Sequence, residues 1–195
     1  MKKSLIVLAA LPLAACISFG AKPPPSLLTL DSAVEPEPGQ AQSSAAARSI
    51  VIAVPTVPQS LATPRVPVQV TPTSIAYVED AQWTEPPARL FARVLTDAVT
   101  ARSGYVVLST VQSVGDPSSQ MAGDLRRFGL DASAREAVVV FDAALTRAGQ
   151  ENVEKRRFQA RVPVVTIDAA AAATGLNQAA NQVAAEVADW VRGGA

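Results

Sequence analysis

The 195-residue chain is balanced in charge and ordinary in composition, and these properties exclude several classes of function. With 17 basic and 17 acidic residues, it has no basic field of the kind that holds nucleic acid. It has no histidine and no GxxxxGK[ST] run, which excludes a Ser/His/Asp triad, a histidine-ligated zinc site and a P-loop. A hydrophobic fraction of 49% predicts a globular domain with a real core, and we expect no cofactor.

The N-terminus has the layout of a secretory signal peptide. Lys2 and Lys3 precede an apolar stretch over 5–13, which is far shorter than the roughly 20 residues of a membrane-spanning helix. The run Leu13-Ala14-Ala15-Cys16 resembles the lipobox of bacterial lipoproteins, in which a lipid is attached to the cysteine and the chain is cut before it. A plain signal peptide with an incidental cysteine is the alternative.

The resemblance at Cys16 divides the chain into three parts. Residues 1–15 are predicted to be the signal peptide, and 16–25 the lipidated cysteine and a tether. The three prolines that close the tether favour an extended conformation, so the tether keeps the domain near the membrane. Residues 26–195 form one domain, in which the polar, low-complexity stretch 32–48 is predicted to be flexible.

Apolar patterning predicts short strands and one helix in the first half of the domain. Pro67 indicates an edge position for its strand, because proline cannot donate to a sheet ladder. The helix has proline in its first turn and Gly104 where it should end. The expected strands cover 27–30, 50–54, 66–70, 74–78 and 105–108, and the expected helix covers 85–102.

The second half predicts antiparallel strands followed by a long helix. Apolar residues alternate over 137–145 and 158–162, with a turn between them, and 124–130 is read as a strand or a short helix. An alanine-rich apolar stripe marks a helix over 174–192. Its polar face is not basic, which favours core packing over a membrane-surface helix. The predicted fold is a single α/β (α+β) domain, with one mixed, largely antiparallel sheet and two main helices packed on it.

Several segments together resemble the ABC-type transport auxiliary lipoprotein family, which includes the Pqi-type intermembrane transport lipoproteins. The most specific match is the stretch 77–86, which contains Tyr77, Trp83, Glu85 and Pro86. The other matching parts are the lipobox, Leu28-Thr29-Leu30-Asp31, the stretch 60–68, the strand pair around Phe141 and Phe158, and a closing helix with Trp190. The chain departs from the family pattern at Leu27-Leu28, where tyrosines are frequent, and in the inserted 32–48 segment.

This resemblance implies a non-catalytic outer-membrane lipoprotein that faces the periplasm and acts as an adaptor in an ABC/MCE-type intermembrane lipid transport system. The implied partners are an MCE-domain substrate-binding protein and the permease and ATPase of the same system. Ile17, rather than aspartate, follows the cysteine, which favours the outer membrane. A lipid-anchored envelope enzyme and an assembly lipoprotein for another outer-membrane machine stay open as alternatives, as does a homo-oligomer.

Two sets of side chains are candidates for contacts. Arg65, Tyr77, Trp83 and Glu85 are candidates for partner binding, although Trp83 equally fits a core position and Arg65 an exposed edge-strand charge. The set Lys155, Arg157 and Arg161 would share one face of a strand, where it could meet phospholipid headgroups or keep that face soluble.

Overall fold

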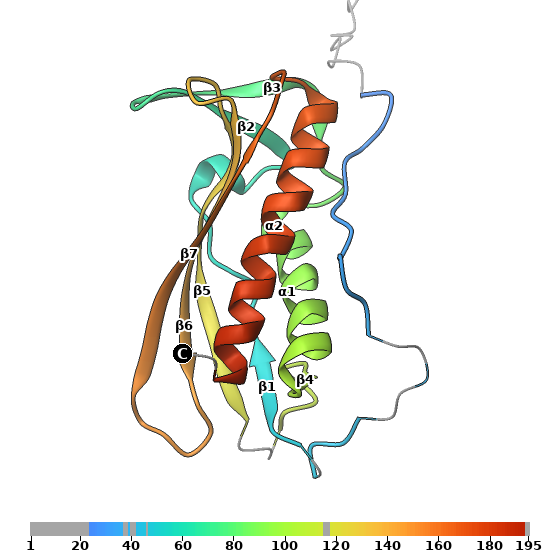
Figure 1. Cartoon of the computed structure of the whole chain (residues 1–195), viewed down its shortest axis with the longest axis vertical. Coiled ribbons are helices and arrows are strands. Elements are labelled where there is room, and N and C mark those ends of the chain that lie inside the picture. The colour runs from blue at the N-terminus through green and yellow to red at the C-terminus, as the bar shows by residue number, and fades with distance from the viewer. Residues whose placement is uncertain (1–23, 37–38, 40–41, 46, 115–117, 194–195) are drawn as a thin grey trace, which may run out of the picture.

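A seven-stranded mixed sheet carries two long helices on one of its faces (Figure 1). The computed structural model describes residues 24–36, 39, 42–45, 47–114 and 118–193. The sheet order is β3-β2-β5-β1-β4, and β6 and β7 continue from the other edge of β5. The strands are β1 (Ser49–Ile52), β2 (Arg65–Thr71), β3 (Ser74–Gln82), β4 (Val106–Leu108), β5 (Ser119–Asp131), β6 (Glu136–Thr146) and β7 (Val153–Pro163). The predicted α+β class is confirmed.

Strand β5 is the centre of the sheet because it pairs along both of its edges. One edge joins β1 in parallel through Ser119–Met121 and then β2 in parallel through Leu130 and Asp131. The other edge joins β6 in antiparallel, and β6 joins β7 in antiparallel over its whole length. The region 124–130 is therefore strand and not a short helix, and the strand is longer at both ends than the sequence predicted.

Two amphipathic helices cover one face of this sheet. Helix α1 (Pro87–Ser103) begins after Pro86 and ends at Gly104, whose φ of 75° is the left-handed geometry that glycine adopts without strain. Helix α2 (Ala169–Arg192) begins at Asp168, whose carboxylate accepts a hydrogen bond from the Ala171 N–H at 2.8 Å. The sequence prediction placed the start of α2 too late, because its first turns are alanines without an apolar period.

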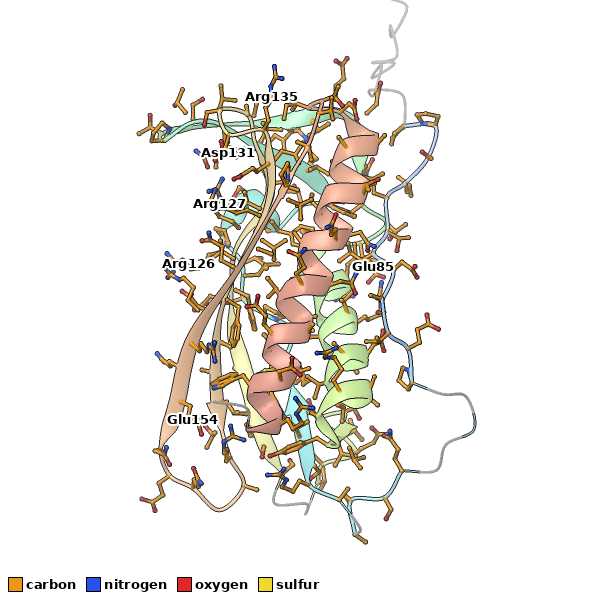
Figure 2. All side chains as sticks on the ribbon, viewed as in Figure 1. Glu85, Arg126, Arg127, Asp131, Arg135 and Glu154 are labelled. Atoms are coloured by element: carbon orange, nitrogen blue, oxygen red, sulfur yellow. The ribbon has the colours of Figure 1, made fainter. Side chains whose placement is uncertain are left out.

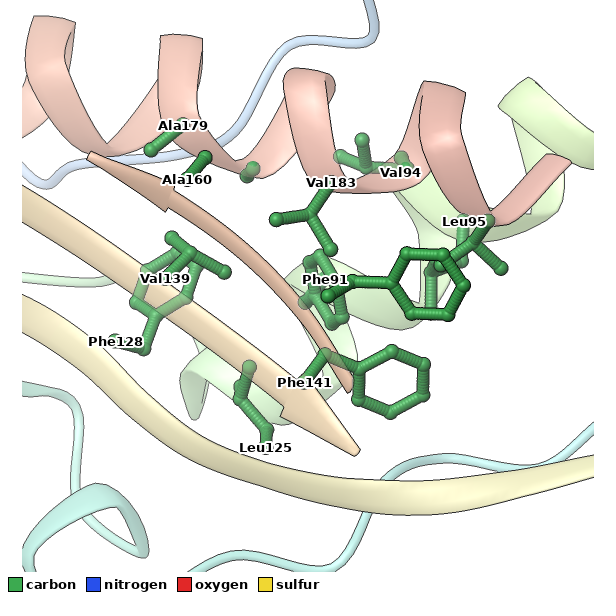
Figure 3. Close-up of a cluster of buried hydrophobic side chains, with 14 of the residues drawn as sticks. Phe91, Val94, Leu95, Leu125, Phe128, Val139, Phe141, Ala160, Ala179 and Val183 are labelled. Atoms are coloured by element: carbon green, nitrogen blue, oxygen red, sulfur yellow. The ribbon is translucent and has the colours of Figure 1, made fainter. Parts of the chain in front are cut away.

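The core lies between the helices and the inner face of the sheet (Figure 3). Phe91 of α1 meets Phe141 of β6 edge to face at 5.4 Å between ring centroids, and it also contacts Phe128 of β5. Trp190 of α2 packs on Phe158 of β7 with the rings tilted, at 5.5 Å between ring centroids. The sheet is thus covered by the apolar stripes that the helical periodicity predicted.

Two predictions about strands are wrong. No strand covers 27–30; only Leu28 forms an isolated bridge, to Trp83. Strand β2 lies between β3 and β5 and is not an edge strand. It tolerates Pro67 because the missing N–H falls where the β2–β3 register shifts, just before regular pairing with β5 begins at Val68.

Candidate functional site

The N-terminal strap, residues 28–33, connects the tether region to the domain. Its backbone N–H groups donate from Leu28 to the Gln82 carbonyl at 2.7 Å, from Asp31 to Asn177 at 2.8 Å and from Ala33 to Asn181 at 2.7 Å. The Ser32 hydroxyl also donates to Asp97 of α1. The strap is therefore fixed to β3 and both helices, although Ser32 and Ala33 belong to the segment predicted to be flexible. Cys16 lies outside the described residues.

Two of the predicted partner-binding residues stack on the surface of the β2–β3 pair. The Arg65 guanidinium carbon lies 3.8 Å from the centroid of the Tyr77 ring. Arg65 is exposed and Tyr77 is half-buried, so both present atoms to a partner. This cation–π contact favours a fixed position of the Arg65 charge over the ring.

Trp83, the third predicted contact, is a core residue. Its side chain is 1% exposed and meets Phe128 edge to face at 5.5 Å between ring centroids. Its indole N–H is buried without a hydrogen-bond partner among the described residues. Trp83 therefore packs in the core at the start of α1, and the ring itself faces no partner.

Replacing Trp83 with alanine should destabilise the domain by about 3–5 kcal/mol, because it empties a large core site. Trp83→Phe should cost much less, since the indole N–H makes no hydrogen bond that phenylalanine would lose. Chemical denaturation followed by circular dichroism measures both. Equal stability of the alanine variant and the wild type would contradict the core assignment.

Glu85 lies just before helix α1 and pairs with Arg93, in the second turn of that helix. The ion pair is 2.6 Å long, and Arg93 is 56% exposed. The hydrogen bond from Arg93 lowers the pKa of Glu85, so the carboxylate stays charged near neutral pH. Figure 2 shows Glu85 on the helix side of the molecule, with Arg126 and Arg127 on the opposite side of the sheet.

The α1–β4 groove is a hollow of about 680 Å³ between helix α1 and strands β1 and β4. Its apolar residues come from the strands and its charged residues from the polar side of α1. The lining includes Ile52, Val54, Val107 and Leu108 on the apolar side and Glu85, Arg89, Arg93 and Asp97 on the charged side. Within the described residues β4 pairs only with β1, so its outer edge is free. An apolar floor beside a free strand edge suits an extended polypeptide segment.

The predicted headgroup cations do lie together on β7, on the outer face, which we define as the sheet face opposite the helices. Lys155, Arg157 and Arg161 are all exposed there. Arg157 donates twice to Asp142, and Arg161 donates to Glu136 at 2.9 Å. The pKa of Asp142 is lowered chiefly by the hydrogen bond from Arg157. Two of the three cations are thus neutralised locally, and Lys155 is in no ion pair with another described residue.

Sequence reasoning missed Arg126 and Arg127, which also present cations on the outer face. The β5–β6 register shifts between Leu125 and Arg127, which is a β-bulge. The bulge leaves Arg126 exposed and Arg127 half-buried, with the latter 3.3 Å from Asp131. Bonds from Ser133, the Ala134 N–H and Arg127 lower the pKa of Asp131 to about 2. Two consecutive arginines inside an apolar strand were the sequence signal for this bulge.

Two absences hold for the part of the chain that the structure describes. No group of three or more metal-binding side chains comes together there. None of the described helices is both long enough and apolar enough to span a bilayer.

Several solved structures match this chain, and two of them illustrate the shared fold. Protein XCC0632 from Xanthomonas campestris, assigned to the DUF330 family, superimposes with a TM-score of 0.70 at 23% identity, covering 86% of this chain and 95% of that one. A second, an uncharacterized protein, gives a TM-score of 0.65 at 19% identity, covering 74% of this chain and 92% of that one. A search of curated proteins gives no match. The class that the fold defines is an α+β domain with a half-covered mixed sheet.

The sequence places the chain within that class. The family model for the ABC-type transport auxiliary lipoprotein component matches residues 28–188, and the chain belongs to this family. The match begins at the N-terminal strap and ends in α2, so it includes the α1–β4 groove and the outer face. The resemblance drawn from Tyr77 to Pro86 and from the closing helix is confirmed.

Proposed function

We propose that this chain is a non-catalytic adaptor of an ABC/MCE-type intermembrane lipid transport system, anchored by lipid at Cys16 in the outer membrane and facing the periplasm. Its proposed partners are the MCE-domain protein, the permease and the ATPase of that system. The observation that carries the proposal is the family match over 28–188, which makes the chain an auxiliary component of transport. The lipobox supports lipid attachment at Cys16, and Ile17 after it favours sorting to the outer membrane.

The α1–β4 groove is the surface best suited to the protein partner. Its volume of about 680 Å³ leaves room for a short extended segment, in which six residues would span roughly 20 Å. Arg89 and Arg93 line the groove beside Glu85. An acidic residue in the bound partner segment could therefore pair with one of these arginines. Arg65 and Tyr77 form a second, smaller contact surface.

Headgroup contact is assigned to the outer face in this proposal, with Lys155 as the main cation. Arg157 and Arg161 contribute less, because each would have to exchange a carboxylate partner for a phosphate. Trp83 contributes only by fixing the start of α1 through its packing in the core.

Reversing one charge in the groove tests the adaptor role. Arg89→Glu in the full-length lipoprotein should weaken binding of the cognate MCE-domain protein at least tenfold, equivalent to about 1.4 kcal/mol. Arg89 is exposed and in no ion pair with another described residue, so the substitution should leave the fold intact. The matched control is Arg126→Glu, the same charge change on the outer face, which should bind as the wild type does. Titration calorimetry in detergent measures both.

One result would count against the adaptor role, and another would count only against the groove as its docking surface. If the wild-type lipoprotein neither binds the MCE-domain protein in vitro nor crosslinks to it in cells, the adaptor role is wrong. If binding is intact in Arg89→Glu but lost in Arg126→Glu, the adaptor role stands and the docking surface moves to the outer face. Arg65→Glu then reports separately on the Arg65–Tyr77 surface.

A further inference from the structure

One end of the domain carries exposed apolar side chains in two of its three neighbouring connections, and we call it the apolar end. It comprises the β2–β3 hairpin, the β5–β6 turn and the loop between β7 and α2, which lie together at the top of Figure 1. Val165 is 87% exposed in the β7–α2 loop, and Ile167 in the same loop is 38% exposed. Val70 and Ile75, which flank the hairpin turn, are 45% and 49% exposed. The opposite end also exposes Val111, Val114 and Val153, so it is the position of the tether that distinguishes the two ends.

The tether enters the domain at this same end. The first described residues, from Pro24, lie beside the start of α2, and the strap then runs along the helices away from it (Figure 1). Leu27, just before the strap, is also exposed. The anchor at Cys16 is therefore attached next to the apolar end.

The length of the tether decides which end of the domain can rest on the bilayer. From Leu28 back to Cys16 the chain advances 12 residues, which reach about 40 Å at full extension. Helix α2 has 24 residues and is by itself about 36 Å long. The far end, with the β6–β7 turn, would meet the membrane only with the tether stretched straight along the helix. The apolar end can meet the membrane while most of the tether remains slack.

The charged groups near the apolar end are compatible with a shallow contact. Asp168 caps α2, and Asp131 is held by Ser133 and Arg127, so these two carboxylates already have donors. Arg135 is at the β5–β6 turn, where Figure 2 labels it at the same end. Glu79 and Asp80 on β3 are exposed, which favours contact at headgroup depth over insertion into the acyl chains.

We infer that the apolar end rests on the headgroup region of the bilayer that holds the anchor, with the β7–α2 loop deepest and Val165 as its main contact. The inference rests on the lipid anchor of the proposed function. It fixes the orientation of the domain: the helices stand upright on the membrane surface, and the far end with the β6–β7 turn points into the periplasm. Lys155 lies near the start of β7 at that far end, so the apolar end replaces the outer face as the contact with the bilayer that holds the anchor.

A pair of matched cysteine variants tests this orientation in the full-length lipidated protein. Lipid blocks Cys16, so Val165→Cys or Val153→Cys supplies the single free thiol for a fluorescent label. Val153 is 54% exposed at the start of β7, next to the β6–β7 turn, and provides the far-end control. The labelled proteins are reconstituted in vesicles of phosphatidylethanolamine and phosphatidylglycerol that contain nitroxide-bearing lipids. We expect quenching at position 165 to exceed quenching at position 153 at least threefold.

Each other outcome overturns the inference, and the causes are distinguishable. Equal quenching at both positions, or weak quenching at 165 in protein that floats with the vesicles, means that the domain does not rest on its apolar end while the anchor stands. If wild-type Cys16 reacts with maleimide and the protein does not float, the anchor fails and the orientation fails with it. Repeating the pair in phosphatidylcholine should preserve the difference, because the contact is apolar; loss of the difference there would contradict the apolar contact.

Discussion

Replacing Val187 with aspartate is expected to prevent the domain from folding. Val187 is 0% exposed in the stripe of α2 that faces the sheet, so the new carboxylate would be buried among apolar side chains. Burying an unpaired charge costs several kcal/mol or forces the group to be protonated, and a domain is stable by only about 5–15 kcal/mol. We expect no cooperative thermal transition in circular dichroism near neutral pH.

The control for Val187→Asp is Gln182→Asp on the exposed side of the same helix. Gln182 is solvent-exposed, and this substitution should change stability by no more than about 0.5 kcal/mol. A Val187→Asp protein that unfolds at the wild-type temperature would show that this face of α2 is accessible to solvent. The interpretation of α2 as a membrane-surface helix would then replace the packed one.

Replacing Cys16 with serine is expected to abolish membrane anchoring. The serine oxygen is not the lipid acceptor of the lipobox, so the acyl chains that hold the protein would be absent. Each buried methylene contributes about 0.8 kcal/mol, and two or more chains make an anchor stable. The contact that we infer at the apolar end would be too small to replace that energy. Metabolic acyl labelling and membrane fractionation after a high-salt wash measure the loss.

The control for Cys16→Ser is Ser18→Ala, which lies two residues further on and leaves the lipobox intact. It should be labelled and should sediment with membranes as the wild type does. Sedimentation of Cys16→Ser after the salt wash would mean that the chain is held by something other than lipid on this cysteine.

The sequence predicted most elements because their apolar periods are set by the face they bury. The stripe through Val183, Val187 and Trp190 and the alternation through Phe158 and Ala160 both belong to the core. Apolar periodicity did not predict elements that pack through small residues or that are defined by pairing between strands. The first turns of α2 are alanines, and at Gly175 a Cβ would come within 2.8 Å of the Ala137 side chain, so the helix lies close on the sheet.

Sheet order and site geometry depended on contacts that are distant in sequence. Pro67 indicated an edge strand, yet a local register shift accommodates it between β3 and β5. Trp83 was a candidate for both a partner contact and a core position, because sequence neighbours cannot show that Phe128, on another strand, covers it. The α1–β4 groove combines a helix and an edge strand whose adjacency no local pattern encodes.

If the chain is anchored at Cys16 as proposed, the N-terminal strap has a mechanical consequence. Any pull between membrane and partner passes from the tether into the domain through Leu28, Asp31 and Ala33, whose backbone is bonded to β3 and α2. The strap runs along the helices from the end where the tether enters, so such a pull loads these bonds together, in shear, and does not open them one at a time (Figure 1). The force is thus shared by several hydrogen bonds at once, and it reaches the two helices and the sheet before any strand separates from its neighbour.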